Sequence, residues 1–338
     1  MASRRISARS IANPARGLTA QAPGEFRTHA LSLPAEAAGL RFDQALVRAL
    51  PQYSRARLKT WIESGAVRVD GRPLRAKDRV LGGEQVRIHA HLPPQGEVQA
   101  EPLPLAVVFR DRLILVIDKP AGLVVHPGAG NPRHTLQNAL LALDPRLALV
   151  PRAGLIHRLD KDTSGLLVIA RTLEAHTVLT AALAARQVTR EYLALCSGVM
   201  TGGGTIDEPI GRHRTLRTRM AVRADGREAI THYRIEQRLW AHTLVRVRLE
   251  TGRTHQIRVH LAHIGFPIVG DPVYGGRRRV PRGCPADAAE ALRAFGRQAL
   301  HATRLVLRHP ASGRELQFQA PLPRDMQQLI GKLAAERA

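Results

Sequence analysis

The spacing of apolar and polar residues after the first forty positions predicts a small domain of two helices and a short sheet. Residues 41–50 have helical periodicity that stops at a proline, and Ser54 is a suitable N-cap for a second helix. Residues 67–69 and 86–88 alternate in the manner of strands, and the Asp-Gly pair after the first of them is typical of a hairpin turn. We expect these elements to form one domain at residues 40–91.

The rest of the chain has the pattern of a larger domain. Residues 92–104 are rich in proline, and we expect a linker there. From residue 105 to 335, short apolar runs separated by turns predict strands, with helices near residues 135–143, 173–186 and 286–298. Their irregular spacing does not repeat as a βαβ unit, which favours an α+β fold with a long mixed sheet. No apolar run approaches the roughly 20 residues of a membrane span, so we expect no membrane partner.

The charge of the chain points to a polyanionic partner. Lys and Arg number 51 against 28 Asp and Glu, a formal net charge of +23. The preference for Arg over Lys is typical of a GC-rich genome, but base composition does not explain the excess of basic over acidic residues. Such an excess favours nucleic acid, because each neutralised phosphate releases counterions. The two cysteines, Cys196 and Cys284, are too few for a disulfide framework and fit a reducing cytoplasm.

Residues 1–39 precede the first predicted domain. Their first 24 positions contain four arginines and no acidic residue. We expect residues 1–39 to be a disordered basic tail that contacts RNA. A transit peptide has a similar composition and is the alternative, although the segment lacks a clear amphipathic period.

The most informative segment for chemistry is residues 154–171, GLIHRLDKDTSGLLVIAR, a polar loop that leads into an apolar strand. Asp160 and Asp162 match the opening of a calcium-binding loop, but the twelfth position is Arg171 where such a loop needs Glu. Two carboxylates also suit glycoside hydrolysis, an activity that fits poorly with so basic a chain. A third interpretation is an ion-paired loop without chemistry. The residues of this loop alone leave these alternatives open.

The predicted domain at residues 40–91 resembles an S4-type RNA-binding domain. It has the same order of two helices and a small sheet, and its polar positions are mostly basic. The alternative is a solvated basic face on an unrelated small domain. The resemblance implies that the domain binds structured RNA through the following basic residues: Arg55, Arg57, Lys59, Arg68, Arg72 and Lys77.

Four blocks of the larger domain resemble the RluA-type pseudouridine synthases, in that family's order. They are DKPAGLVVHP at 118–127, HRLDKDTSGLL at 157–167, REYLA at 190–194, and ETGRTHQIRVHLAHIGFPIVGDPVYG at 250–275. With the S4-like domain, the resemblance covers about residues 40–335. It implies an α+β protein, in which an N-terminal S4-like (α-L) RNA-binding domain precedes a pseudouridine synthase domain with a long mixed, largely antiparallel sheet.

The resemblance also implies the activity. Pseudouridine forms when the bond from uridine N1 to C1′ breaks, the base turns, and C5 bonds to C1′. No atom is gained or lost and no redox change occurs, so we expect neither a cofactor nor a metal. The implied substrate is a stem-loop of large-subunit ribosomal RNA in the assembling particle, the helix 69 hairpin. We expect a monomer in the cytoplasm. The rival function is a non-catalytic ribosome-assembly factor, and a target in another rRNA or tRNA loop is a further alternative.

The family's motifs assign roles to individual residues. Asp160 is the carboxylate at the sugar, which either attacks C1′ or removes the C2′ proton. The resemblance indicates Arg258 as its ionic partner, with the nearer Arg253 as the alternative. Tyr192 is expected to stack on the base and to remove the C5 proton. The alternative for Tyr192 is a half-buried strand tyrosine without a chemical role.

Other residues are expected to bind the target nucleotide. Arg158 is expected to fill the vacancy left by the flipped base, and Leu159 and Ile257 to form walls of the pocket. His255 belongs to a cluster with His260 and His263 that suggests zinc, but we find no third ligand set with suitable spacing. We expect these histidines to contact backbone or phosphate, and His255 to bind substrate. Basic loops at 212–219 and 277–279 are expected to follow phosphates.

Overall fold

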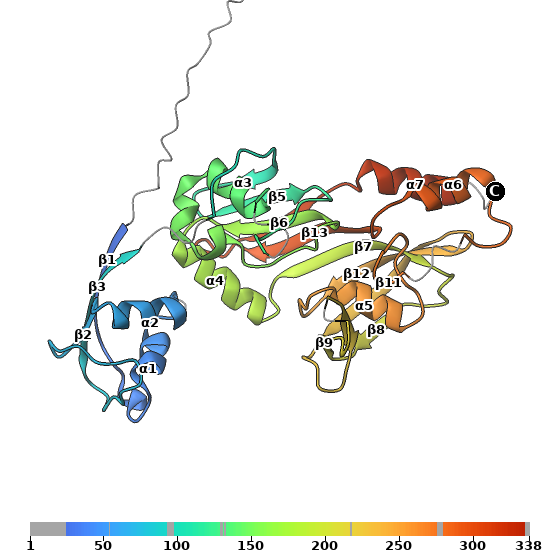
Figure 1. Ribbon diagram of the computed structural model, residues 1–338. Helices are drawn as coiled ribbons and strands as arrows, with labels where there is room; N and C mark the ends of the chain where they lie inside the picture. The colour runs from blue at the N-terminus through green and yellow to red at the C-terminus, as the bar shows by residue number, and fades with distance from the viewer. Residues whose placement is uncertain are drawn as a thin grey trace, which may run out of the picture.

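The computed structural model describes residues 25–53, 55–92, 98–128, 131, 133–216, 218–275 and 280–334. Four expectations therefore lie wholly or partly outside the described residues: the tail at 1–24, the N-cap at Ser54, residues 93–97 of the linker and the basic loop at 277–279. The described chain forms a small N-terminal domain beside a larger, elongated one (Figure 1). None of its described helices is long and apolar enough to cross a membrane.

The small domain contains the two predicted helices, one 3₁₀ turn and a three-stranded sheet. Its elements are β1 (Glu25–Ser32), η1 (Ala35–Ala37), α1 (Phe42–Ala49), α2 (Arg55–Glu63), β2 (Val67–Val69) and β3 (Gln85–Leu92). The strands pair in the order β1-β3-β2. The predicted turn follows β2, where Asp70 and Gly71 both have the positive φ angles that such a turn requires.

The predicted boundary of this domain is wrong at its N-terminal side. Residues 25–39 are not a tail, because Glu25–Ser32 pairs with β3 along its whole length, from Glu25 opposite Leu92 to Ser32 opposite Gln85. Local pattern gave little sign of this strand, since its partner lies more than 50 residues later in the chain. The other end of the pairing extends β3 to Leu92, the first residue expected in the linker.

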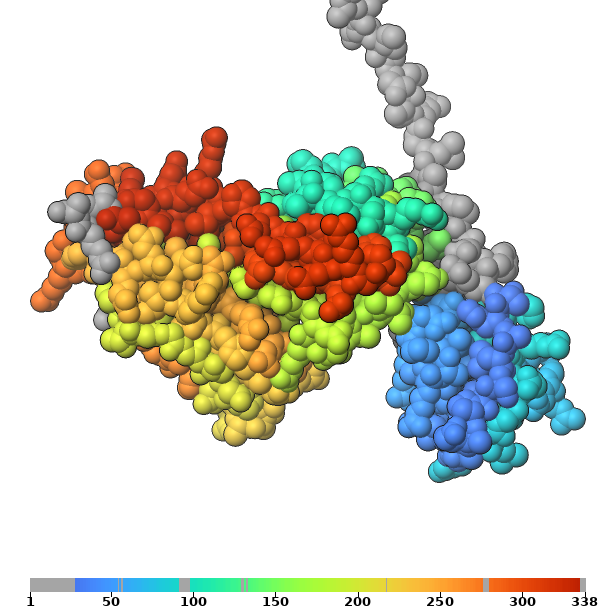
Figure 2. Space-filling view, turned by 180° about the vertical axis from the view of Figure 1, so that it is seen from behind, coloured from blue at the N-terminus to red at the C-terminus, as the bar shows by residue number. Residues whose placement is uncertain are grey.

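The small domain has its own core, which one residue of the large domain joins. Phe42, Leu58 and Trp61 from the two helices pack against the inner face of the sheet. Burying such side chains stabilises a domain by roughly 1.5–3 kcal/mol each. Leu173, from the large domain, belongs to the same apolar cluster. Seen from behind, the small domain adjoins the large one at one end only (Figure 2).

The large domain is built on a mixed sheet of nine strands within the described residues, which confirms the predicted fold class. The strand order is β4-β5-β6-β13-β7-β12-β11-β8, with β14 paired to β13. Their bounds are β4 Ala106–Arg110, β5 Ile114–Lys119, β6 Ser164–Ala170, β7 Thr189–Ser197, β8 Gly204–Asp207, β11 Ile230–Arg238, β12 His242–Leu249, β13 Leu300–Arg308 and β14 Glu315–Gln319. A separate two-stranded ribbon joins β9 (Ile210–Arg212) to β10 (Met220–Val222).

Only β6 and β13 run parallel among these described pairs, at His301 opposite Ser164 and Ala302 opposite Gly165. Gly165 has a φ of +115°, and a Cβ atom there would collide with the backbone of Ala302. The close approach therefore requires glycine at this position. It fixes the end of the loop at residues 155–163, which precedes β6, against the middle of the sheet.

Helices cover both faces of the central strands. Alternate residues of β5 and β6 enter two different apolar clusters, one of which includes α4. Both faces are thus buried, which explains the uninterrupted apolar runs in the sequence. The remaining elements are η2 (Pro145–Leu149) and η3 (Pro151–Gly154), together with the helices α3 (Leu136–Leu143), α4 (Leu173–Ala184), α5 (Gln256–His263), α6 (Ala286–Ala294) and α7 (Arg324–Ala334). The sequence pattern did not predict α7, and it extended α6 by four residues.

Candidate active site

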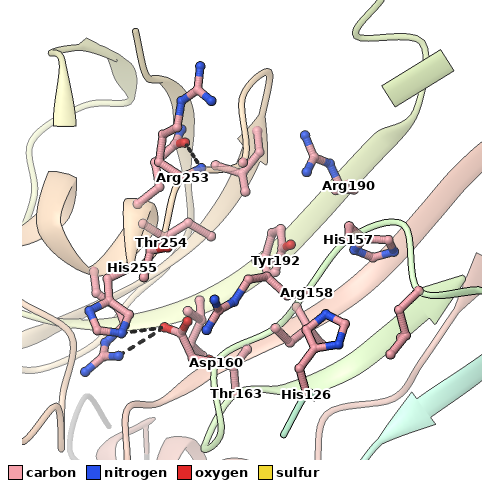
Figure 3. A pocket seen from close by; sticks show the side chains of 18 of the residues that line it. His126, His157, Arg158, Asp160, Thr163, Arg190, Tyr192, Arg253, Thr254 and His255 are labelled. Atoms are coloured by element: carbon pink, nitrogen blue, oxygen red, sulfur yellow. Dashed lines mark hydrogen bonds and ion pairs between the residues drawn. The ribbon is translucent and has the colours of Figure 1, made fainter. Parts of the chain in front are cut away.

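A cavity of about 600 Å³ opens beside the middle of the large sheet. Most of its lining comes from segments that are distant in sequence: the loop at 155–163, the strand β7, and residues 252–258 at the start of α5. Asp160, Tyr192 and Arg158 lie close together in this cavity (Figure 3). His126, of the first sequence block, also lines the cavity, so the fold brings together residues from all four blocks.

Asp160 contacts Arg258 in the wall of the cavity. The Nη1 atom of Arg258 donates a hydrogen bond of 3.0 Å to Oδ2 of Asp160. The side chain of Asp160 is 15% exposed and that of Arg258 is 5% exposed. A carboxylate that is open to the cavity on one side thus meets a buried cation on the other.

Arg258 is held in place by a second carboxylate, that of Asp271. Its Nε and Nη2 atoms donate to the two oxygens of Asp271 at 2.7 and 2.9 Å. The backbone N–H groups of Val273 and Tyr274 donate to Asp271 at 2.8 and 3.0 Å. Burial alone would raise the pKa of Asp271, but its hydrogen bonds with Arg258 hold that pKa below the ordinary value. Sequence reasoning assigned no role to Asp271, although it lies in the last family block.

Arg258 remains a cation in this environment. Burial would lower its pKa, but the hydrogen bonds and the charge of Asp271, with the charge of Asp160 added, raise the pKa above the ordinary value. The guanidinium also lies over the ring of Tyr274, 5.1 Å from its centroid. Charge, hydrogen bonds and ring contact therefore all fix its orientation.

His255 occupies the N-cap of α5 with a left-handed backbone, φ +57°. Its Nδ1 atom lies 2.8 Å from the hydroxyl of Tyr274, which also accepts a hydrogen bond from the backbone N–H of Met220. The Nε2 atom of the same ring lies 4.0 Å from Oδ2 of Asp160. Burial lowers the pKa of His255, so the ring is neutral at pH 7.

Tyr192 projects from β7 into the cavity and is almost fully buried. The strand is held on both sides, with Tyr192 opposite Ala302 of β13 and Val247 of β12. Burial raises the pKa of the tyrosine hydroxyl, which the charge of Arg190 opposes and the charge of Asp160 reinforces. The ring is therefore rigidly placed and its hydroxyl is protonated at neutral pH.

The loop that carries Asp160 is fastened by groups that sequence reasoning missed. The buried Nζ of Lys119 donates to the carbonyls of Pro120, Leu123 and Lys161 at 2.7, 2.9 and 2.9 Å. Burial lowers the pKa of Lys119 to about 7, although the nearby Asp162 and Asp160 oppose this shift. The position of this lysine in the DKPAGL block was the available signal.

Two residues just before β13 fasten the same loop from the other side. Arg297 donates to the carbonyl of Asp162 at 3.1 Å, and the side-chain amide of Gln298 donates to the hydroxyl of Thr163 at 3.1 Å. Both residues lie in the RQALHAT segment at 297–303. The position of Asp160 therefore depends on contacts from both sides of its loop.

The structure separates the predicted partners of Asp160. Arg258 contacts it, whereas the side chain of Arg253 donates to the carbonyl of Glu228 at 2.9 Å. Leu159 and Ile257 are buried in the cavity wall, and Arg158 is exposed at the same cavity.

The three histidines that suggested zinc have different surroundings. His260 contacts the hydroxyl of Thr231 and the carbonyl of Glu208, each at 2.9 Å. His263 is exposed, and His255 lines the cavity. Across the described ranges, no group of three or more His, Cys, Asp or Glu side chains is placed to hold a metal ion.

The basic residues of the small domain occupy two kinds of position. Arg68, Arg72 and Lys77 are exposed near the β2 hairpin and the loop that follows it. On α2, Arg55 pairs with Asp43 at 2.7 Å and Lys59 pairs with Glu63 at 3.5 Å, although all three basic groups of that helix were expected at the RNA. The third, Arg57, is partly buried, and its charge lowers the pKa of His176 of α4 after the larger effect of burial. It therefore lies toward the large domain.

Comparison with known proteins places both domains. Residues 113–263 match the family model of RNA pseudouridylate synthases, and residues 40–86 match that of the S4 domain. A protein of Xanthomonas campestris pv. campestris, named ribosomal large subunit pseudouridine synthase D, is 53% identical over 90% of this chain and 92% of its own length. The protein of the same name from Escherichia coli K12 is 54% identical over 88% of this chain and 92% of its own length.

A solved structure shares the fold of the large domain. The human protein named RNA pseudouridylate synthase domain containing 4 aligns with a TM-score of 0.53 and 29% sequence identity. The alignment covers 68% of this chain and 92% of the human one.

Proposed function

Because the chain belongs to the RNA pseudouridylate synthase family, we propose that it isomerises uridine to pseudouridine in large-subunit ribosomal RNA. The observation that carries this proposal is the pair formed by Asp160 and Arg258, 3.0 Å apart at a cavity that also contains Tyr192. The cavity, about 600 Å³, has room for one flipped nucleoside.

Asp160 acts at the sugar. Its carboxylate either bonds to C1′ as N1 leaves, or removes the C2′ proton so that a glycal forms. In both routes the electron pair of the N1–C1′ bond leaves with the base, which becomes a uracil anion. Arg258 keeps the carboxylate oriented, and the bound nucleotide excludes water from its open side.

The base then turns so that C5 faces C1′. In one route the C5–C1′ bond forms as the Asp160–C1′ bond breaks, and in the other C5 adds to C1′ of the glycal while Asp160 returns the proton to C2′. Tyr192 provides a rigid ring for stacking, and its hydroxyl takes part in transferring the C5 proton, which finally resides on N1. Arg158 is exposed at the mouth of the cavity, where its planar guanidinium can replace the flipped base in the RNA stack. Leu159 and Ile257 supply apolar walls, while His255 and Arg253 contact the nucleotide or its phosphates.

The proposed substrate is the helix 69 stem-loop of the assembling large subunit, bound by the enzyme as a monomer. The names of the relatives support large-subunit rRNA, and the exposed Arg68, Arg72 and Lys77 support binding of structured RNA by the small domain. The finer choice of helix 69 rests on the sequence resemblance described above.

A map of pseudouridines in ribosomal RNA tests this proposal. Carbodiimide treatment and primer extension should show stops in helix 69 of wild-type cells and none there in cells that lack the gene. Expression of the wild-type protein should restore the stops, whereas Asp160→Asn should not. If the stops vanish from another loop, the target is wrong; if no stop depends on the gene, the protein is not the proposed rRNA synthase. Light scattering of the purified enzyme tests the monomer.

A further inference from the structure

The cavity contains a buried cation that the mechanism above does not use. Arg190 lies two residues before Tyr192 on β7, so both side chains project from the same face of the strand into the same cavity. Figure 3 shows the two rising from this strand on the same side of the sheet. Only 8% of Arg190 is exposed.

Arg190 has no acidic partner among the described residues. Its only hydrogen bonds there are long ones, 3.4 Å from Nη2 to the carbonyls of Glu250 and Thr251. Its Nε atom is buried without an acceptor. By contrast, the neighbouring Glu191 on the opposite face is paired with Arg246 and Arg304. Burying a cation without a counter-ion lowers the stability of the fold. Proteins keep such a residue where a ligand supplies the missing negative charge.

The surroundings of Arg190 leave the cavity side of the guanidinium available. Gly252 lies directly against it, and a Cβ atom at that position would stand 2.8 Å from Nη1 of Arg190. Of the other nearby groups, His157 is neutral, because burial and then the charge of Arg190 lower its pKa to about 3. Leu249 and Leu300 complete an apolar surround in the cavity. No described carboxylate pairs with the guanidinium of Arg190.

We propose that Arg190 is a catalytic residue that binds the uracil anion released when the N1–C1′ bond breaks. This rests on the proposed isomerisation at Asp160. When the bond breaks, its electron pair stays on the base, and the negative charge spreads over N1, O2, C5 and O4. Arg258 is already neutralised by two carboxylates, so it supplies little to the base. Arg190 is the buried cation of this cavity wall that lacks such neutralisation, and its guanidinium can donate to a carbonyl oxygen of the base.

The buried position separates this role from ordinary phosphate binding. Phosphates of a flipped nucleotide remain at the RNA backbone, outside the cavity, whereas the base enters it. A stabiliser of the leaving base should also matter most when the base is a poor leaving group. Fluorine at C5 withdraws electrons and stabilises the uracil anion, so 5-fluorouridine provides a substrate that needs the cation less.

The test compares Arg190→Gln with the wild type under single-turnover conditions, on stem-loop RNA with uridine or 5-fluorouridine at the target. Gln retains an amide donor for the two carbonyls but removes the charge. We expect a loss of about 100-fold with uridine and only about 10-fold with 5-fluorouridine, with RNA affinity within about 2-fold of wild type. Arg190→Lys should recover part of the rate. Because a costly charge is removed, the Tm of Arg190→Gln should equal or exceed that of wild type.

Three results would overturn the proposal. Equal losses on both substrates with a lowered Tm would mean that Arg190 is structural. A loss confined to RNA affinity would make it a phosphate ligand. A loss with uridine alone, accompanied by a primary isotope effect from deuterium at C5, would assign Arg190 to proton removal with Tyr192. Absence of isomerisation by the wild type would instead count against the proposed function.

Discussion

Asp271 holds Arg258 by two hydrogen bonds of 2.7 and 2.9 Å, and this arrangement leaves Nη1 of Arg258 for the carboxylate of Asp160. The buried carboxylate thus determines where the guanidinium points, and the guanidinium determines where Asp160 points. If Asp271 contacted only Arg258, the two side chains could move together. Here the Val273 and Tyr274 N–H groups anchor Asp271 to the backbone.

Asp160→Asn should remove isomerisation while RNA binding survives. The substitution is nearly isosteric but removes the charge that attacks C1′ or accepts the C2′ proton, so we expect the single-turnover rate to fall by about 10⁴-fold or more. Filter binding and tritium release from C5-labelled RNA measure the two properties separately. Turnover by the Asn variant above the level of wild-type contamination would remove Asp160 from the mechanism.

Asp271→Asn should affect both stability and rate. Breaking a buried ion pair costs about 3 kcal/mol of unfolding free energy, and loss of a group that orients a catalytic residue costs about 10- to 100-fold in rate. The pKa of Asp271 is lowered in the folded state, so its contribution to stability is present above the unfolded pKa and is lost as pH falls through the folded pKa. Urea unfolding at pH 7 and in acid measures this.

Asp225→Asn is the matched control for that experiment. Asp225 also pairs with an arginine, Arg223, but its side chain is largely exposed. An ion pair this exposed is screened by solvent and contributes little to stability, so this variant should resemble wild type in both measurements. A similar loss of activity in both Asn variants would show that the effect of Asp271→Asn is not specific to the buried pair.

Tyr192→Phe should stop the reaction after the glycosidic bond has broken. Phe keeps the stacking surface but lacks the hydroxyl, so release of tritium from C5 should fall by about 100-fold or more. RNA affinity should remain close to wild type because the ring is retained. Tritium release at the wild-type rate would show that another group takes the C5 proton.

Lys119 should make the stability of the protein rise with pH. Burial lowers its pKa to about 7 in the folded protein, whereas the unfolded chain keeps a value near 10.4. Between these values the unfolded state binds more protons, so unfolding free energy gains up to about 1.4 kcal/mol per pH unit from this group. Urea unfolding of the wild type and of Lys119→Met from pH 7 to 10 should differ by this slope. Parallel curves would show that the lysine stays charged.

Replacing Arg68, Arg72 and Lys77 by Ala should weaken RNA binding without changing the chemical step. Each lost phosphate contact reduces the slope of log affinity against log salt by about 0.7–0.9, so three contacts should reduce it by about 2–3. The rate at saturating RNA should stay the same, because none of the three lies at the cavity. An unchanged salt slope would mean that this face does not anchor the RNA.

Much of the fold could be predicted from local pattern. The strands β5, β6 and β12 are apolar enough to be recognised alone, and the periodicity of α1 is clear. The strand β1 was missed because its short, mixed sequence is stabilised by pairing with β3, a contact that local spacing does not record.

The site was predictable only in part, for a similar reason. Asp160 and Tyr192 stand in blocks that resemble a family, so they could be named. The geometry that joins Arg258 rather than Arg253 to Asp160 depends on the left-handed start of α5, and the support from Asp271 and Lys119 depends on tertiary contacts. Whether Arg190 has an acidic partner depends on residues that are distant in sequence, so it cannot be predicted from the sequence of β7.

Because β6 pairs with the distant strand β13, the active site can be completed only late in synthesis on the ribosome. The loop with Asp160 is complete in sequence once residue 163 has emerged, but its clamp from Gln298 comes 135 residues later. At about 5–20 residues per second, that interval lasts roughly 7–27 seconds. During it the nascent chain presents its RNA-binding domain but no finished catalytic centre. The protein therefore gains its affinity for RNA before it gains its reactivity.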